Sequence, residues 1–445
     1  MEAGSGAVVT PASVGEALAE KIRARTARVG VVGLGYVGLP LAVEFAEAGF
    51  PVTGIDVSES KVSMVNAGQS YVKDVESGSL GRLVESRRVR ATSDFSVIRE
   101  LDTINICVPT PLRKTRDPDM SYVVAAADEI ARHFREGKLV ILESTTYPGT
   151  TDELLLPKLA RSGLQVGRDF FLCFSPERVD PGNPKFNTRN IPKVVGGVTA
   201  ACTQMGVLLY SQALERVVAV SSTQVAEMVK LLENTFRMIN IGLVNEMALM
   251  CDRMGIDVWE MIDAAATKPF GFMPFYPGPG LGGHCIPIDP FYLSWKSKQA
   301  GIEARFIELA GYINGQMPHF VVDKIQNALN EQAKPLKNSH VHIMGVAYKR
   351  DIDDMRESPA LDIAHLLLKR GSRITYSDPY VSALRVDSME LFAQDPEAMA
   401  ESADCVVIVT DHSGAPYGAV VEKARVIVDT RNALRGFRSP KIVRL

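Results

Sequence analysis

The sequence predicts an α/β protein in which two domains built on parallel sheets are joined by a long central helix. Short β-branched runs alternate with helical periods in both halves of the chain, and a Pro-free, largely apolar helical stretch separates the halves. The length of 445 residues is about three times that of a usual domain, so we expect several domains, each with its own core. Apolar residues make up 46% and charged residues 23% of the chain, as in ordinary globular proteins.

The first sheet domain is predicted over residues 28–220. Its helical period is clearest at 39–48, after the first strand. The predicted strands are 29–32, 52–55, 103–108 and 139–142, with 170–174 and 217–220 completing the sheet. Residues 1–27 form an N-terminal extension that mixes Glu16, Glu20, Lys21 and Arg23 into an amphipathic stretch. This extension lacks the apolar core of a signal peptide, so we expect a cytoplasmic location.

A central helical domain is predicted over residues 221–330. Ser221 and Gln224 have the spacing of a capping box, and the following helix, to about Arg253, is apolar on nearly every face. We expect this helix to be well buried, to connect the domains and to contribute to a subunit interface in a homodimer or higher homo-oligomer. A second helix is expected over 305–330. Six prolines and five glycines between 269 and 290 predict a shaped loop between the two helices.

The second α/β domain is predicted over residues 331–445, where the alternation of strands and helices returns. The runs that indicate it are 341–345, 361–368, 374–376, 405–409 and 426–428. No GxGxxG sequence follows the run at 341–345, so a second dinucleotide site is not indicated.

Charge and cysteine content exclude several classes of function. The net charge is −3 and both signs are interspersed, which leaves no basic stripe for nucleic acid. The longest apolar runs are strand-sized and far shorter than the roughly 20 residues that span a bilayer, so no membrane segment is expected. The six cysteines show no CxxC pair and no paired Cys/His spacing, so neither disulfides nor a metal site are predicted. Four of them indicate core positions, Cys202 lies in a polar, turn-like run, and Cys285 alone has unusual neighbours.

The glycine-rich sequence at 33–38 has the context of a dinucleotide-binding turn in a Rossmann-like domain. It follows a predicted strand and opens a helix, and Asp56 closes the next strand. Gly33 allows the tight turn, Gly35 lets backbone approach the pyrophosphate, and Gly38 lets helix and strand pack closely. A carboxylate at position 56 accepts hydrogen bonds from a ribose 2′-hydroxyl and repels a 2′-phosphate. The sequence therefore favours NAD over NADP as the cofactor.

Cys285 lies in the loop sequence 282–289, between glycines and the carboxylate of Asp289. A core cysteine would lie in an apolar helix or strand. A nucleophilic thiol needs a cation or base nearby, because only a few per cent of an unperturbed thiol is ionised at pH 7. Lys230 is the candidate cation, with Asn234 one turn further along the same helix face. Two polar side chains on an otherwise apolar helix are costly to bury unless they meet polar partners, which favours a site.

Together these segments resemble the UDP-glucose/GDP-mannose dehydrogenase family over essentially all of residues 28–435. The matching motifs are 32–40, 107–111, 143–146, 175–177, Lys230 with Asn234, the Cys285 loop and 353–357. The run from Lys268 to Pro290 is most similar to bacterial UDP-N-acetylglucosamine 6-dehydrogenases. UDP-glucose enzymes more often have Tyr before the cysteine and Lys before the aspartate, where this chain has His284 and Ile288.

The resemblance implies a four-electron oxidation of the C6 alcohol of a nucleotide-linked sugar with two molecules of NAD. The implied path runs through an aldehyde captured by Cys285 as a thiohemiacetal, then a thioester, then hydrolysis. Lys230 and Asn234 are expected to stabilise oxyanion character, and Asp289 to orient water and thiol. Thr145 and Glu177 are expected to place water and to assist proton transfer.

The resemblance also implies binding residues. Those for the cofactor are Gly33, Gly35, Tyr36, Val37, Gly38, Asp56, Thr110, Thr145 and Arg356. Those for the substrate are Glu177, Lys230, Asn234, Tyr276, Gly282, Lys349 and Arg431. One position departs from the UDP-glucose enzymes, which have a second Glu four residues after the Ser-Pro-Glu acid, where this chain has Pro181. The general base for the alcohol step is therefore Glu177 or Asp180, with Glu177 ranked first.

Three other functions stay open on the sequence. UDP-glucose or dTDP-glucose is an alternative substrate to UDP-N-acetylglucosamine. A two-electron hydroxyacid-type dehydrogenase also joins an NAD domain to a helical one, but it has no use for a nucleophilic thiol. A nucleotide-sugar-binding regulator without turnover is disfavoured, because Cys285, Lys230, Asn234 and Asp289 occur together.

Overall fold

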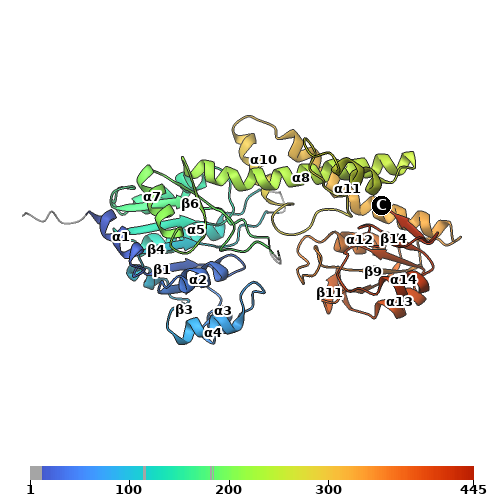
Figure 1. The fold of residues 1–445 in the computed structure, drawn as a ribbon, viewed down its shortest axis with the longest axis horizontal. Coiled ribbons are helices and arrows are strands. Elements are labelled where there is room, and N and C mark those ends of the chain that lie inside the picture. The colour runs from blue at the N-terminus through green and yellow to red at the C-terminus, as the bar shows by residue number, and fades with distance from the viewer. Residues whose placement is uncertain (1–12, 114–116, 181–182, 184) are drawn as a thin grey trace, which may run out of the picture. The chain divides into compact units, whose positions relative to one another are not determined.

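The computed structural model describes residues 13–113, 117–180, 183 and 185–445. The chain divides into two compact units, Met1–Leu232 and Glu233–Leu445, and the division falls inside the long helix α8 (Thr223–Met254). Each unit holds one large sheet, in the blue-to-green and the orange-to-red parts of the ribbon (Figure 1). The predicted class, two parallel-sheet domains and a long central helix, is confirmed.

The sheet of the first unit has eight strands in the order β3-β2-β1-β4-β5-β6-β7-β8. The strands are β1 (Val29–Val32), β2 (Val52–Ile55), β3 (Val89–Thr92), β4 (Thr103–Ile106), β5 (Lys138–Leu142), β6 (Phe170–Phe174), β7 (Lys193–Gly197) and β8 (Val217–Val220). All neighbouring pairs are parallel except β6 and β7, which are antiparallel. The sequence did not predict β3 and β7, and the antiparallel pair corrects the expectation of a purely parallel sheet. The strand order reverses between β1 and β4, which is where an open α/β sheet forms its ligand crevice.

Alternate residues of these strands enter two cores, one on each face of the sheet. Leu139 and Ile141 of β5 join one core with helices that include α1, α2 and α7, whereas Val140 and Leu142 join the other with α5 and α6. The helices of this unit are α1 (Val14–Arg23), α2 (Gly38–Glu47), α3 (Glu59–Asn66), α4 (Ser77–Glu85), α5 (Ser121–Arg132), α6 (Leu156–Ala160) and α7 (Ala200–Tyr210), with single turns η1 (Phe95–Glu100) and η2 (Thr151–Leu155). Cys202 is buried in α7 and not in a turn, because Thr199 caps that helix three residues before it.

The central segment is mostly helical, and Cys285 lies in a loop directly before one of its helices. Its helices are α8, α9 (Val258–Ala266), α10 (Asp289–Gln299) and α11 (Arg305–Asn330). Three expectations are corrected. The hydroxyl that caps α8 belongs to Ser222 and not to Ser221, since Ser222 Oγ accepts from Val225 N–H at 3.2 Å. α8 is not buried all round, because Leu243, Met250 and Met254 are exposed. Asp289 and Pro290 begin α10 and are not part of the loop, since proline is well suited to the first turn of a helix.

The sheet of the second unit has five parallel strands in the order β10-β9-β13-β14-β15, and a hairpin, β11–β12, lies beside it. The strands are β9 (His340–Met344), β10 (Arg373–Ser377), β11 (Ala383–Val386), β12 (Met389–Phe392), β13 (Cys405–Ile408), β14 (Ile427–Asp429) and β15 (Ile442–Arg444). Its helices are α12 (Pro359–Lys369), α13 (Pro396–Ser402) and α14 (Tyr417–Lys423). The larger core of this unit also takes in the C-terminal half of α8, so α8, α9 and α11 share one hydrophobic core with the second sheet. None of the helices in the described ranges is both long and apolar enough for a membrane crossing.

Candidate active site

The glycine-rich turn after β1 has the geometry that the sequence predicts. Gly33 has φ +93°, in the left-handed region that favours glycine, and a Cβ on Gly38 would lie 1.8 Å from the Gly33 carbonyl oxygen. A Cβ on Gly35, by contrast, would meet no atom within 4 Å. Gly33 and Gly38 are therefore required by packing, whereas Gly35 leaves open space above the backbone at the beginning of α2. In dinucleotide-binding domains, the pyrophosphate lies at such a helix N-terminus.

Asp56 follows β2 and is tied to this turn. Its Oδ2 accepts from the N–H of Leu34 at 2.8 Å, and its Oδ1 accepts from the N–H of Ser58 at 2.9 Å. Lys61 Nζ lies 3.5 Å from Oδ2. The carboxylate thus holds the glycine turn against the end of β2, where a ribose hydroxyl would meet it.

The other site residues of the first unit follow neighbouring strands. Thr110 comes after β4, Thr145 after β5 and Glu177 after β6. Because the carboxyl ends of β1, β4, β5 and β6 lie side by side, the fold brings these segments to the same sheet edge as the glycine turn. Tyr36 at that turn is exposed. Pro181 lies outside the described residues.

Glu177 is the most constrained of these side chains. Its Oε1 accepts from the N–H groups of Arg178 and Val179, and Lys193 Nζ lies 3.2 Å from its Oε2. Burial opposes the charge, but Lys193, the N–H donors and Lys230 outweigh it, so the pKa of Glu177 lies below its usual value. Glu177 is therefore held ionised. An ionised carboxylate with few lone pairs left is better suited to orient water than to shuttle protons near neutral pH.

Lys230 is on the N-terminal half of α8, one turn after Glu227. The Glu227 carboxylate accepts from Gly149 N–H at 2.5 Å and from the N–H and hydroxyl of Thr151 at 2.9 and 2.7 Å. This carboxylate ties the first turns of α8 to the loop that begins at Thr145. The helix that carries Lys230 and the loop that carries Thr145 are thus held in a fixed relation.

The second unit holds the cysteine loop. Cys285 is partly exposed, whereas the other five cysteines are buried. The Cys285 carbonyl accepts from the N–H groups of Ile288 and Asp289, which forms a turn directly before α10. Gly283 N–H donates to the Arg356 carbonyl at 2.9 Å, and a Cβ on Gly282 would lie 2.5 Å from Tyr348 Cβ. The glycines therefore let the loop approach the segment after β9 closely.

Asn234 and Asp289 meet in this unit, as the sequence predicts for polar groups on an apolar helix. Both are buried, and Asn234 Nδ2 donates to Asp289 Oδ2 at 2.7 Å. A pair of buried amides that joins α8 to α11 was not predicted. Asn245 Nδ2 donates to Asn314 Oδ1 at 2.8 Å, and Asn245 Oδ1 accepts from Gly278 N–H at 2.9 Å. These amides fix the loop against α8 and α11.

The remaining predicted binding residues border the second sheet. Arg431 is partly exposed, its Nε donates to the Val409 carbonyl at 2.9 Å, and a Cβ on Gly278 would lie 2.6 Å from its Nη1. Arg356 is exposed and forms a two-pronged ion pair with Asp354. Tyr276 is exposed, stacks on Trp259 and donates to Asp263 Oδ1 at 2.7 Å. Lys349 is partly exposed in the segment after β9.

Chemically, the first unit supplies a glycine turn and an anchored carboxylate, and the second supplies a partly exposed cysteine whose carbonyl accepts from the N–H of Asp289, a member of a buried amide–carboxylate pair. Within the described residues, no group of three His, Cys, Asp or Glu side chains is arranged to hold a metal ion. Sequence reasoning missed Lys193, because the strand that carries it was not predicted and a lysine at a strand end gives no local signal.

Comparisons with known proteins agree with this division. Models of the UDP-glucose/GDP-mannose dehydrogenase family match residues 27–214 (NAD binding domain), 224–316 (central domain) and 342–436 (UDP binding domain). A UDP-N-acetyl-D-mannosamine dehydrogenase of Salmonella typhi is 36% identical, over 92% of this chain and 99% of that protein. A UDP-N-acetyl-D-glucosamine 6-dehydrogenase of Pseudomonas aeruginosa is 34% identical, over 87% and 90%. The solved UDP-D-ManNAc dehydrogenase of Pyrococcus horikoshii superposes with a TM-score of 0.85 at 32% identity, covering 94% of this chain and 98% of that one.

Proposed function

The chain belongs to the UDP-glucose/GDP-mannose dehydrogenase family, an NAD-dependent enzyme family, and on that premise we propose that it oxidises the C6 alcohol of a UDP-linked sugar to a carboxylate through Cys285. The observation that carries the proposal is the setting of this thiol. Cys285 is the one partly exposed cysteine, and its loop is fixed by the Gly283–Arg356 backbone bond. It also lies four residues before Asp289, whose carboxylate is held by Asn234.

The proposed reaction has four steps. The C6 alcohol loses a hydride to NAD and a proton, which gives the aldehyde. The Cys285 thiolate adds to the aldehyde carbon to give a thiohemiacetal, and loss of a second hydride and proton gives the thioester. Water then forms the C–O bond as the C–S bond breaks, which returns the thiol and releases the acid. Each hydride is accepted by a separate molecule of NAD, and the aldehyde never has to leave the protein.

Each polar residue has a proposed role in these steps. Lys230 and Asn234 stabilise negative charge on the C6 oxygen, and Asp289 orients the thiol and the water. Glu177 and Thr145 place the hydrolytic water. Glu177 has a lowered pKa and already accepts from three donors, which makes it a weak proton acceptor. We therefore propose Asp180 as the stronger candidate for the base of the alcohol step, which reverses the order that the sequence suggested. Asp180 is partly exposed in the described segment that precedes Pro181.

The nucleotide is proposed to bind the segments that surround the cysteine loop. Lys349 and Arg431 are the cations for its phosphates, Tyr276 and Gly282 border its sugar, and Arg356 reaches the NAD pyrophosphate after leaving Asp354. Thr110, Tyr36 and Val37 complete the NAD contacts along the glycine turn.

The proposed sugar is a 2-acetamido hexose, with UDP-N-acetylglucosamine as the first candidate from the cysteine-loop sequence. UDP-N-acetylmannosamine is the second candidate, because the Salmonella typhi enzyme that carries that name is 36% identical over 99% of its length. The deciding assay compares kcat/KM for these two sugars, UDP-glucose, UDP-N-acetylgalactosamine and dTDP-glucose. A preference of ten-fold or more for UDP-glucose would contradict the 2-acetamido assignment.

The two-hydride path is tested by counting NADH formed per sugar consumed. Two NADH per sugar are expected, and a ratio of one would identify a two-electron dehydrogenase and remove the thioester. Cys285→Ala should abolish acid formation, with Cys251→Ala, a buried cysteine of α8, as the matched control. Full acid formation by the Cys285 variant would contradict covalent catalysis. Binding of sugars without any NADH formation would instead indicate a regulator.

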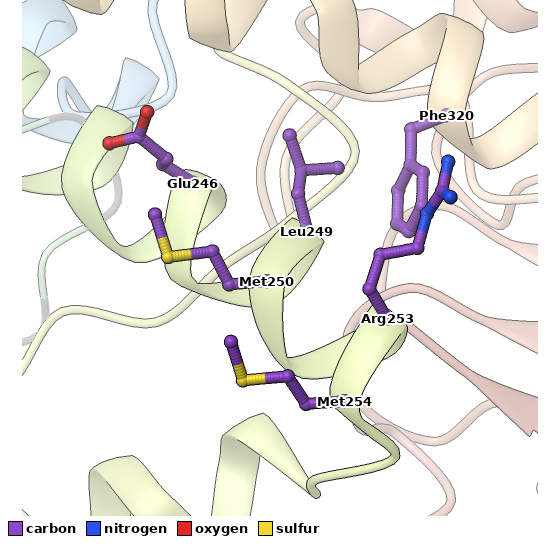
Figure 2. Close-up of a pocket in the computed structure, with 6 residues that line it drawn as sticks. All are labelled: Glu246, Leu249, Met250, Arg253, Met254 and Phe320. Carbon is purple, nitrogen blue, oxygen red and sulfur yellow. The ribbon is translucent and has the colours of Figure 1, made fainter.

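We also propose that the protein is a homodimer joined at a groove between α8 and α11. The groove has a volume of about 510 Å³ and is lined by Glu246, Leu249, Met250, Arg253, Met254 and Phe320. Arg253 lies beside Phe320, and Glu246 lies at the other end of the row (Figure 2). Glu246 and Arg253 lie at equal spacing from the pair Leu249–Met250 along α8. An antiparallel second copy would therefore set Glu246 of each chain against Arg253 of the other, as a two-fold interface requires.

The test of this interface is charge reversal. Glu246→Arg and Arg253→Glu should each shift sedimentation from dimer toward monomer, since each sets like charges against one another. The double variant should restore the dimer, because it exchanges the two signs. A monomeric wild-type protein at micromolar concentration, or a double variant as weak as the singles, would contradict the proposed interface.

A further inference from the structure

A buried ion cluster lies behind Glu177 in the first unit. Lys193 Nζ is 2.6 Å from Glu143 Oε2 and 3.2 Å from Glu177 Oε2. The side chains of Lys193 and Glu143 are 5% and 0% exposed, whereas that of Glu177 is 11% exposed. Lysine is almost never buried this deeply unless it is paired. Glu177 is the most exposed of the three side chains, and Lys193 contacts its carboxylate from the buried side.

The antiparallel strand explains how a lysine comes to lie there. In a parallel sheet, the first residue of a strand lies at the edge opposite the ligand crevice. β7 runs the other way relative to β6, with Cys173 opposite Gly197 and Phe174 opposite Gly196. Continuing this register by three residues sets Lys193, the first residue of β7, opposite Glu177. The reversal of one strand therefore delivers an ammonium group to the edge where β4, β5 and β6 end.

Glu143 anchors the far side of the lysine. It follows β5, and its Oε1 accepts from Asn105 Nδ2 at 2.7 Å and from the Tyr210 hydroxyl at 2.6 Å. With its second oxygen on Lys193, this carboxylate accepts from three buried donors. Glu143 therefore fixes the position of Lys193, and Lys193 in turn fixes Glu177.

We propose that Lys193 is a positioning residue for the hydrolytic step: it holds the Glu177 carboxylate ionised and aimed, so that its remaining lone pair accepts a hydrogen bond from the attacking water. This inference rests on the proposed function of Glu177. In the step concerned, the water oxygen bonds to the thioester carbon and the C–S bond breaks. One water proton ends on the Cys285 sulfur, and the proton of the acid product goes to solvent.

Lys193 and Glu143 have opposite effects on the ionisation of Glu177. Lys193 on β7 and Lys230 on α8 favour its ionised form. The Glu143 carboxylate contacts the same ammonium group as Glu177 and, as a like charge, disfavours the ionised form of Glu177. The Cys107 thiol after β4 and the Tyr210 phenol on α7 are buried near Glu143. Removing the charge of Lys193 and removing that of Glu143 should therefore move the ionisation of Glu177 in opposite directions. A purely structural cluster would not predict this difference in sign.

The experiment measures the pH profile of kcat and the pre-steady-state NADH burst for Lys193→Met, Lys193→Arg and Glu143→Gln. In Lys193→Met, kcat should fall about 10- to 100-fold and its acid limb should move up by about one pH unit or more. The burst of two NADH per site should persist, because only hydrolysis is slowed. Lys193→Arg keeps the charge and should return the acid limb toward the wild-type position.

The matched control is Lys138→Met. Lys138 is equally buried and is also the first residue of a strand, but β5 is parallel to its neighbours, so Lys138 lies at the opposite sheet edge and bonds the Arg99 and Leu101 carbonyls. Its loss should lower the thermal midpoint without moving the acid limb. If Lys193→Met behaves like this control, the positioning role is overturned.

Glu143→Gln decides the question even if Lys193→Met does not fold. Glutamine can still accept from Tyr210 and Asn105, and loss of the like charge beside Glu177 should move the acid limb down. An acid limb that stays in place or moves up would contradict the proposal. A wild-type ratio of one NADH per sugar would instead remove the thioester, and with it the proposed function, so the two failures are distinguishable.

Discussion

The two sheet domains begin with the same strand–loop geometry and use it in opposite ways. Gly33 after β1 and Gly345 after β9 both have positive φ, +93° and +81°. After Gly33, the helix begins at once at Gly38, and the space above Gly35 is open. After Gly345, no helix begins until Pro359. The second loop therefore offers no helix N-terminus to a phosphate.

The carboxylates at the ends of the neighbouring strands complete this difference. Asp56 accepts one N–H of the first loop, that of Leu34. Asp378 accepts two N–H groups of the second loop, those of Val346 and Ala347, at 2.8 and 3.0 Å, and His412 Nε2 lies 3.0 Å from the same oxygen. The anion of the second loop is thus a side chain of the protein itself. When a side chain of the protein accepts the N–H groups of such a turn, those groups cannot bind a phosphate.

The largest effect is expected from a substitution that displaces α2 from the first loop. Gly38→Ala puts a Cβ 1.8 Å from the Gly33 carbonyl oxygen, so α2 must move away from the turn. We expect KM for NAD to rise about 100-fold or more, because misplacement of a binding element by about 1 Å can cost that factor. The measurement is NAD titration with steady-state kinetics.

The matched change in the second loop is Gly345→Ala, whose Cβ would lie 2.5 Å from Thr410 Cβ. It should lower the thermal midpoint and leave KM for NAD unchanged. A rise in KM for NAD in this variant would break the comparison, since the second loop would then contribute to the cofactor site.

A smaller but still large effect is expected from Asp378→Ala. The substitution removes the acceptor of the buried His412 ring and of four N–H groups, those of Val346, Ala347, Tyr380 and Val381. Each unsatisfied buried group costs about 1–3 kcal/mol. Chemical unfolding should show a loss of several kcal/mol in the second unit. A loss below about 1 kcal/mol would mean that the loop does not depend on its internal anion.

Buried His342 of β9 makes the second unit sensitive to acid. Burial, followed by the neighbouring His340, lowers the pKa of His342 from 6.5 to about 4. Between these two pH values, the folded state binds fewer protons than the unfolded state. The contribution of His342 to the free energy of unfolding is therefore fully present above pH 6.5 and falls as the pH drops toward 4. The slope is about 1.4 kcal/mol per pH unit at most.

The measurement for His342 is the thermal midpoint at pH 7 and at pH 5. His342→Gln, which can still bond Thr375 and Ser377, should flatten the difference between the two midpoints. His365→Gln, at an exposed histidine on α12, is the control and should keep the full difference. An unchanged slope in His342→Gln would assign the acid sensitivity to other groups.

The smallest expected effect is that of Asp56→Asn. One amide oxygen can replace only one of the two acceptors that serve Leu34 and Ser58, and it no longer repels a 2′-phosphate. We expect kcat/KM for NAD to fall about ten-fold, since a hydrogen bond to a charged acceptor is worth about 1.5–3 kcal/mol. The preference for NAD over NADP should narrow, because Lys61 can then meet a 2′-phosphate. Unchanged discrimination between NAD and NADP would contradict the ribose role of Asp56.

Features that depend only on neighbouring residues could be predicted from the sequence. The turn at 33–38, strands such as β1 and β6, helix α11 and the loop before Cys285 follow from local periodicity, glycine and proline, which act over a few residues. Only the tertiary structure decided that β7 runs antiparallel, that Lys193 faces Glu177, and that Asp378 closes the second loop. Those facts depend on strand order and register between residues far apart in the chain. A lysine or an aspartate at a strand end looks the same in the sequence whichever partner the sheet brings to it.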